Sequence, residues 1–419
     1  MSEPHGQTST DRSFLSWRAI GVVVGGLLCQ MGLGYGYAVS ALAGEILADL
    51  DWTRTMYSSA MAPQLFVIAL SSPLVGAATI RFGSRGVLAG AAVVLGVAFL
   101  LLSGLEALWQ LYGLVILMGL AVAGLGDISV SQAVSQWFPR GRGLALGIVF
   151  TGSNIGGFLL VWGSSTIAEA DSWRTAFLVM GVGAFVILLP AALLLIRNAP
   201  AATGRETDDP DALGVAIGNR EVLRTRSFWI LAFCLFTFFF YFMALLQHLV
   251  LFLTDHGMAT EDAREWFRNA ILLGFVSKIT LGLAASFLPA RTTILIDYAL
   301  IAASSIALLF LPDANWLPIF ILSYGFATAA RDVVYPLIVT HCFGLASMAS
   351  VYGLLMLALL PGGTLGPLFA AAVHDATGSY TVAFQVFCVL NLAALASLTF
   401  VRNERLSAPS SDATAAARR

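Results

Sequence analysis

The stretch GFVSKITLG, residues 274–282, decides how the rest of the sequence is interpreted. It lies inside an apolar run of about twenty residues, the length that a helix needs to cross a bilayer. Lys278, the only lysine of the chain, lies near the middle of this run. A cation at that depth costs about 2.5–3.5 kcal/mol or more, so it requires a partner, a water-filled cavity or an anionic ligand. Lys278 is therefore either part of a structural ion pair or the docking charge for an anionic solute.

The composition around this stretch is that of a polytopic membrane protein. Hydrophobic residues make up 58% of the 419 residues and charged residues 11%, whereas soluble domains carry about 25% charged residues. The net charge is -2, and no basic cluster indicates a nucleic-acid partner. The first eighteen residues are polar, so we expect no cleaved signal peptide. The four cysteines lie in apolar segments without the spacing of disulfides or metal ligands, and we expect neither metal nor cofactor.

Twelve apolar segments are long enough to be transmembrane helices. They fall near residues 19–45, 56–80, 86–104, 108–137, 144–168, 174–196, 228–254, 267–288, 292–311, 315–342, 348–372 and 380–401. A polar stretch at about 197–227 separates the sixth from the seventh. The pattern predicts an all-α membrane protein with twelve transmembrane helices in two six-helix bundles.

The predicted organisation has five parts whose orientation follows from the arginines. They are an N-terminal tail (1–18), an N-terminal bundle (19–196), a linker (197–227), a C-terminal bundle (228–401) and a C-terminal tail (402–419). With both termini inside, sixteen arginines fall in the inner loops and tails and four in the outer loops. Because inner loops of membrane proteins are enriched in basic residues, we expect a multi-pass protein of the cell (inner) membrane with cytoplasmic tails and linker.

The two halves of the sequence resemble each other at matching distances. GAATIRFGSR at 76–85 is followed 206 residues later by GLAASFLPAR at 282–291. Asp127 lies eleven residues before a phenylalanine, and Asp332 lies at the same distance from another one. Two parallel repeats of this kind place a solute site between the halves, near the middle of the membrane.

The 6+6 arrangement and the first of these loops resemble the major facilitator superfamily. Residues 76–85 fit the pattern Gly-x-x-x-x-Arg-x-Gly-x-Arg, although the family commonly has an aspartate where this chain has Ile80. The resemblance assigns Arg81, Gly83 and Arg85 to an inner gating loop.

A narrower resemblance follows the fourth span. WFPRGRGLALGI, residues 137–148, is similar to the fifth-helix signature of the monocarboxylate transporter family, including its bacterial members. Its arginines, Arg140 and Arg142, join the inner gating loop. In that family the eighth helix carries a cation that binds the substrate carboxylate, and Lys278 occupies this place. An acid linked to proton movement often precedes that cation by one turn, where this chain has Gly274.

Three further charges are expected at membrane depth. Asp127, Arg331 and Asp332 either hold helices together as ion pairs, or one acid changes its partner or its proton during transport. Arg331 is also a candidate contact for the solute. Asp297 and Glu45 are interpreted as structural residues nearer the membrane surfaces.

Aromatic residues and one histidine complete the candidate site. Tyr35, Tyr37, Tyr241 and Tyr335 are candidates to line a cavity and to offer hydroxyls to a carboxylate, with Tyr35 and Tyr335 favoured. His248, in the seventh span, is either a hydrogen-bonded core residue or a contact for the solute.

The resemblance implies a secondary active transporter that works by alternating access. The expected solute is a small organic anion of the monocarboxylate class, with a proton as candidate co-substrate. One alternative is a carrier of a vitamin, an aromatic compound or another amphipathic solute such as riboflavin; another is a membrane sensor, although the tails are short for an output domain. No nucleotide loop, metal cluster or nucleophile with a base indicates an enzyme. The expected partners are the solute, protons and the lipid bilayer, and the expected state is a monomer without nucleic acid.

Overall fold

The computed structural model describes residues 17–139, 141–197, 217–311 and 314–404, and this part of the chain is helical without a strand. The helices of the first group, in chain order, are α1 (Trp17–Met31), η1 (Gly32–Gly34), α2 (Tyr35–Ala41), α3 (Ala43–Leu50), α4 (Arg54–Met61), α5 (Pro63–Leu102), α6 (Leu108–Leu125), α7 (Asp127–Trp137), α8 (Arg142–Ala170), α9 (Trp173–Gly183), η2 (Ala184–Leu188) and η3 (Ala191–Leu195). After the short α10 (Asn219–Val222), the helices of the second group are α11 (Arg226–Asp255), α12 (Thr260–Ala284), α13 (Ala290–Leu308), η4 (Ala314–Trp316), α14 (Leu317–Phe343), α15 (Met348–Leu355), η5 (Met356–Ala358), α16 (Leu359–Thr377) and α17 (Thr381–Leu398).

The described chain contains eleven helical segments that are long and apolar enough to cross a membrane. The longest runs over 49 residues, Arg54–Leu102, which is about 74 Å of helix at 1.5 Å per residue. That length is more than twice the ~30 Å hydrocarbon core of a bilayer. It is interrupted at Gly83, whose φ of 77° and ψ of 156° are not helical. The predicted second and third spans therefore form one segment that bends at Gly83.

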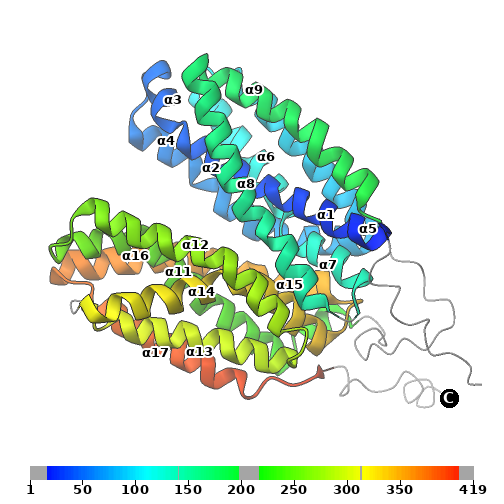
Figure 1. Cartoon of the computed structure of the whole chain (residues 1–419), viewed down its shortest axis with the longest axis vertical. Coiled ribbons are helices and arrows are strands. Elements are labelled where there is room, and N and C mark those ends of the chain that lie inside the picture. Colours follow the sequence, from blue (N-terminus) through cyan, green and yellow to red (C-terminus); the bar gives the residue numbers. More distant parts are fainter. Residues whose placement is uncertain (1–16, 140, 198–216, 312–313, 405–419) are drawn as a thin grey trace, which may run out of the picture.

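Each group of helices has its own apolar core. One core draws on residues 19–196 and takes in Val333 and Leu337 of α14, and the other draws on residues 222–401 and takes in Ala69 and Ile128. Figure 1 shows the two groups as separate bodies that converge at one end of the molecule. Residues 1–16, 198–216 and 405–419, with most of the predicted linker and tails, lie outside the described residues. The predicted domain boundaries stay predictions.

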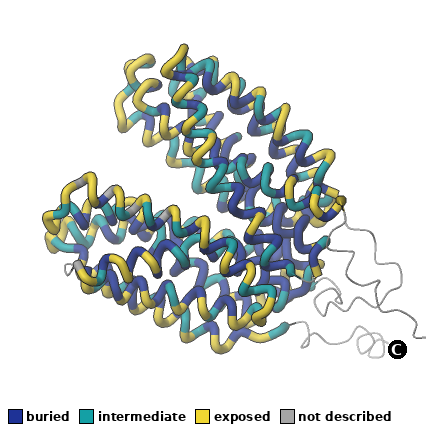
Figure 2. Tube along the Cα trace, viewed as in Figure 1, coloured by how far each residue is buried: buried dark blue, intermediate teal, exposed yellow. Residues whose placement is uncertain are grey.

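The groups touch where backbones approach closely, at what we call the closed end. A Cβ added to Gly143 of α8 would lie 2.6 Å from the carbonyl oxygen of Gly282 in α12, so only glycine fits there. Nearby, the Leu144 N–H donates to the Ser286 hydroxyl at 3.3 Å. Figure 2 shows buried residues concentrated where the groups meet. Small residues that allow such contact are typical of helix interfaces in membranes.

The groups diverge at the opposite end, which we call the open end. There α3 and α4 are separated from α16 and from the beginning of α12 (Figure 1). The molecule is thus a pair of helical bundles that contact each other at the closed end and diverge at the open end.

Candidate functional site

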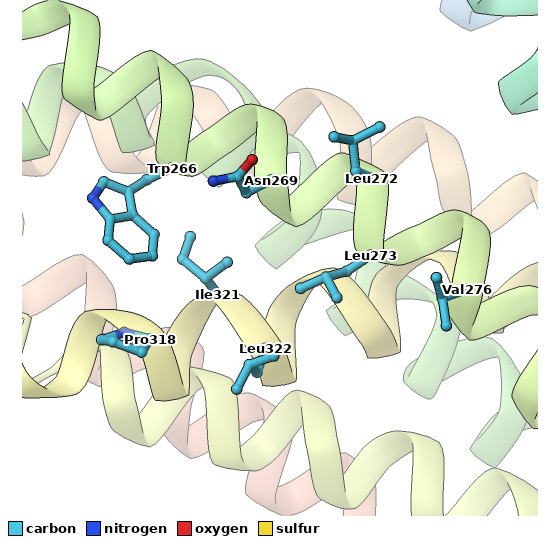
Figure 3. Close-up of a pocket in the computed structure, with 8 residues that line it drawn as sticks. All are labelled: Trp266, Asn269, Leu272, Leu273, Val276, Pro318, Ile321 and Leu322. Carbon is cyan, nitrogen blue, oxygen red and sulfur yellow. The ribbon is translucent and has the colours of Figure 1, made fainter.

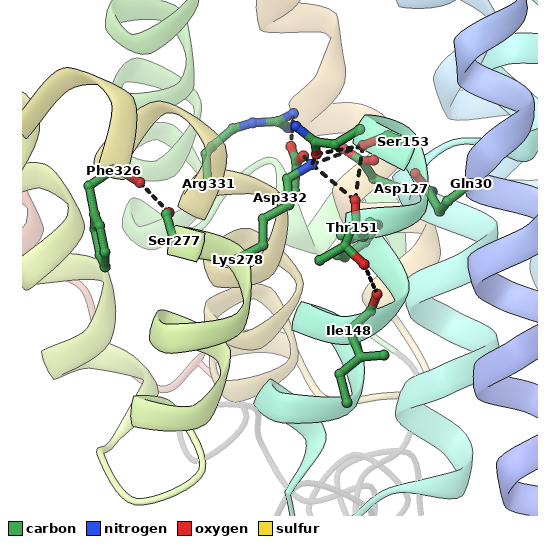
Figure 4. A network of polar contacts seen from close by, with 12 residues as sticks. Gln30, Asp127, Ile148, Thr151, Ser153, Ser277, Lys278, Phe326, Arg331 and Asp332 are labelled. Carbon is green, nitrogen blue, oxygen red and sulfur yellow. Dashed lines mark hydrogen bonds and ion pairs between the residues drawn. The ribbon is translucent and has the colours of Figure 1, made fainter. Parts of the chain in front are cut away.

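The charges that lie at membrane depth form one network between the two groups (Figure 4). The Lys278 ammonium on α12 lies 2.9 Å from Oδ2 of Asp332 on α14. The other oxygen of Asp332 accepts from the Arg331 guanidinium. Nη1 of Arg331 lies 3.3 Å from Oδ2 of Asp127 on α7. Two cations and two carboxylates balance, which is what allows four charges to lie inside a membrane protein.

Lys278 is also held by the first group. Its ammonium donates to the Phe150 carbonyl at 3.0 Å, the Ser153 hydroxyl at 2.9 Å and the Asn154 side-chain oxygen at 3.0 Å, all on α8. The side chain is 4% exposed. An ammonium has three N–H donors, and four acceptors surround it, the three on α8 and the Asp332 carboxylate. Every N–H of the Lys278 ammonium therefore has a hydrogen-bond acceptor. Lys278 therefore joins α12 to α8 across the contact between the groups.

Arg331 is bound on several sides. Nη1 donates to the Tyr352 hydroxyl at 3.2 Å, and that hydroxyl donates to Oδ2 of Asp127 at 3.3 Å. The guanidinium carbon lies 5.5 Å and 5.4 Å from the ring centres of Phe238 and Phe239, within the range of a cation–π contact. Its Nε atom is buried and has no hydrogen-bond partner within the described structure.

Local sequence explains how these side chains reach one point. Gly126, with extended backbone angles, ends α6 and makes Asp127 the first residue of α7, where the helix dipole favours a carboxylate. Arg331 and Asp332 precede Pro336 in α14. Because proline has no N–H, it cannot donate to the Asp332 carbonyl one turn earlier.

Asp332 keeps 18% of its side chain exposed, so one edge of the network stays accessible.

The four candidate tyrosines fall into two kinds of environment. Tyr35 donates to the Met180 carbonyl at 2.9 Å inside the first group, and Tyr335 meets the Tyr298 hydroxyl at 2.7 Å inside the second group. Tyr241 is likewise buried. Tyr37 is 62% exposed and lies within electrostatic range of Asp332. Tyr37 is thus the accessible tyrosine at the network, whereas the hydroxyls of Tyr35 and Tyr335 are engaged in cores; their contact with a solute stays a prediction.

His248 is held within the second group. Its two ring nitrogens lie 3.2 Å from the Tyr380 hydroxyl and 3.2 Å from the Pro367 carbonyl oxygen. These contacts join α11, α16 and the start of α17. They are those of a hydrogen-bonded packing residue, and the predicted role in solute contact is untested.

The predicted gating loop lies at the closed end. Gly83 provides the bend in α5, and the Arg81 guanidinium lies 5.2 Å from the Phe82 ring centre. Arg85 lines a shallow surface depression with Arg197. Arg142 is buried at the start of α8, and Arg140 lies outside the described residues. Of these residues, Arg142 directly precedes Gly143 at the contact between the groups, and the gating role of the loop stays a prediction.

Packing explains why an acid does not stand at Gly274. A Cβ added to this glycine would lie 2.7 Å from the Cβ of Ala329 in α14. A carboxylate there would push α12 away from α14. The position usual for an acid in the resembling family is therefore filled here by close helix packing.

Asp297 and Glu45 are the two acids that the sequence analysis interprets as structural, and Glu45, on α3, is exposed. Asp297 lies on α13 and is fully buried. Neither carboxyl oxygen has a hydrogen-bond partner within the described structure. The sequence signal that points to Asp297 is the presence of an acidic residue inside an apolar span. Tyr352, Ser153 and Asn154 carried no comparable signal, since hydroxyls and amides are common in such spans.

An apolar depression of about 480 Å³ lies between α12 and α14 (Figure 3). Its lining includes Trp266, Asn269, Leu272, Val276 and Leu322. Asn269 is nine residues from Lys278, about two and a half helical turns. The depression therefore lies on the face of α12 opposite the charge network. Within the described residues, no group of potential metal ligands occurs.

Membrane-spanning helices in two groups, with a balanced charge network where the groups meet, define a membrane transport protein. The chain belongs to the major facilitator superfamily, whose model matches residues 23–359. This family consists of transporters and not of enzymes, and the predicted fold class and family are confirmed.

Named relatives support the same assignment. The chain is 25% identical over 366 residues to monocarboxylate transporter 13 of Bos taurus, covering 87% of this chain and 82% of that protein. It is 25% identical over 418 residues to the oxalate:formate antiporter of Oxalobacter formigenes, covering 94% of both. The crystal structure of the E. coli fucose:proton symporter FucP superposes with a TM-score of 0.73 at 14% identity, over 93% of this chain and all of that one, which shows a shared fold.

Proposed function

We propose that the protein is a secondary active transporter that moves a small organic anion, of the monocarboxylate class, across the cell membrane. The observation that carries the proposal is the Lys278–Asp332 ion pair, which lies in the second group where Lys278 contacts α8 of the first, and in which the Asp332 side chain is 18% exposed. Relatives named for monocarboxylates, oxalate and formate all handle carboxylates, which supports this class of solute.

The geometry suggests how an anion would bind. A solute carboxylate entering from the open end replaces Asp332 as the acceptor of the Lys278 ammonium, while the α8 acceptors keep that ammonium in place. Arg331 supplies a second cation within the same network. Charge-assisted hydrogen bonds of this kind contribute about 1.5–3 kcal/mol.

The arrangement of the groups supports alternating access. Superfamily transporters of this repeat type rock one bundle against the other around a site at mid-depth. With the arginine-rich loops inside, the closed end is cytoplasmic, both termini are cytoplasmic, and the open end faces the exterior. Lys278 then binds α8 in the outward-facing state.

Uptake into proteoliposomes tests the proposal. Purified protein would be assayed with labelled lactate, pyruvate and riboflavin, with and without an inward proton gradient. We expect lactate or pyruvate to accumulate above the level of protein-free vesicles. Uptake of riboflavin alone would favour the alternative carrier of amphipathic solutes, and uptake of none of the three would overturn the monocarboxylate assignment.

A further inference from the structure

Two buried polar groups in the second group of helices lack hydrogen-bond partners within the described structure. One is the carboxyl of Asp297, which has both oxygens unpartnered, and the other is Nε of Arg331. Asp297 lies within electrostatic range of Arg331 and of Asp332. An ionised carboxylate buried without hydrogen bonds is costly, and such a group escapes the cost by holding a proton.

We propose that Asp297 is the proton-binding site of the transport cycle, and that Arg331 exchanges Asp127 for Asp297 when the two groups separate at the closed end. The inference rests on the proposed function, for which it names the coupling residue. Asp127 and Asp332 then act as ion-pair partners of the two cations, and not as proton carriers.

A count of charges gives the reason for the exchange. Asp127 belongs to the first group, and the other three charges of the network belong to the second. When the groups part at the closed end, Lys278, Arg331 and Asp332 leave the second group with one excess positive charge. A bound monoanion cancels that charge. Once the anion has left, an ionised Asp297 cancels it instead.

The proton step is balanced. The O–H bond of the Asp297 carboxyl breaks, its electron pair stays on the oxygen, and the proton leaves to water on the side to which the site has opened. The carboxylate formed accepts from the unpartnered Nε–H of Arg331. One proton thus leaves on the same side as one monoanion, which is symport.

The surroundings of Asp297 limit the groups that compete for this role. The charged groups in range are Arg331 and Asp332. Tyr298, Tyr335 and Cys234 form the neighbouring set of titratable side chains on α13, α14 and α11. Tyrosines and thiols are uncharged at neutral pH. Tyr298 and Tyr335 also bond to each other, so the carboxyl of Asp297 is the group suited to exchange a proton.

Asp297→Asn separates proton coupling from solute binding, because the asparagine amide has the shape of the protonated Asp297 carboxyl. Proteoliposomes would be assayed for exchange of labelled lactate and pyruvate and for their accumulation under a proton gradient. We expect Asp297→Asn to retain exchange and to lose accumulation, and Asp297→Glu to retain both. The matched control is Asp375→Asn, whose side chain is 85% exposed, and it should behave as the unaltered protein. Gradient-driven accumulation by Asp297→Asn at the unaltered level would overturn the proposal.

A second measurement does not depend on the solute. Infrared spectra of the purified protein at neutral pH should contain the C=O stretch of a protonated carboxylic acid. We expect this band to be absent in Asp297→Asn and displaced in Asp297→Glu. If neither variant alters it, Asp297 is not protonated and the proposal fails, even when no member of the panel is transported. Failure of transport alone contradicts only the proposed function.

Discussion

At the scale of single residues, the sequence identified the charges at depth but not their partners. Lys278, Arg331, Asp127 and Asp332 stood out because charges are rare within apolar spans. Their meeting in one network depends on the rotation and tilt of three helices, α7, α12 and α14, which hydropathy does not determine. The same limit applies to Tyr35 and Tyr335. Hydropathy predicts the spans that contain them, but it does not predict that each tyrosine points into the core of its own group of helices.

The Tyr352 hydroxyl provides a test of the network by a small change. Tyr352→Phe removes the group that accepts from Arg331 and donates to Asp127. Each lost hydrogen bond has a charged partner and costs about 1.5–3 kcal/mol, so we expect a lower Tm of the purified protein with transport partly retained. Tyr112→Phe is the matched control, since its hydroxyl meets Ser59 in an exposed position. Equal Tm values for the two variants would contradict the role of Tyr352.

At the scale of elements, the repeat in the sequence predicted where helices turn. Gly83 and its counterpart 206 residues later, Pro289, are both non-helical. Glycine reaches the positive φ that the first bend requires, and proline begins a helix without needing a donor. The sequence did not predict that the second and third spans would form one bent segment, because hydropathy falls in the loop whether or not helical turns continue through it.

The contact of α8 with α12 gives a prediction about closure. Gly143→Leu places a side chain where Gly282 and Ala285 leave no space, so we expect the closed end to open while the protein still inserts. The measurement is the thiol reactivity of a cysteine at Gln132, a buried residue whose amide donates to the Leu345 carbonyl. The four native cysteines are buried, so background labelling is low.

In this assay Gln132→Cys should react slowly alone and rapidly when combined with Gly143→Leu. The matched control is Gly90→Leu, since a Cβ at Gly90 meets nothing within 4 Å. Rapid labelling in the Gly90→Leu background, or slow labelling in both, would contradict the role of the α8–α12 contact in closure.

At the scale of the whole molecule, the arginine asymmetry predicts the orientation in the membrane. Single cysteines would replace Glu106, in the exposed turn after α5, and Arg224, in the exposed segment before α11. An impermeant thiol reagent added to intact cells should label the first and not the second, while both should react in opened membranes. Labelling of the Arg224 position in intact cells would reverse the proposed topology.

The central claim is that Lys278 binds the anion that the protein carries, and direct binding tests it. Labelled lactate and pyruvate would be titrated onto purified Lys278→Arg and onto the double variant Lys278→Met with Asp332→Asn, which removes the cation without stranding its carboxylate. Losing a charge-assisted hydrogen bond costs about 1.5–3 kcal/mol, so the double variant should remain folded and bind roughly ten- to a hundredfold more weakly. Lys278→Arg keeps the charge and should bind at an intermediate level. A folded double variant with unaltered affinity would contradict the claim.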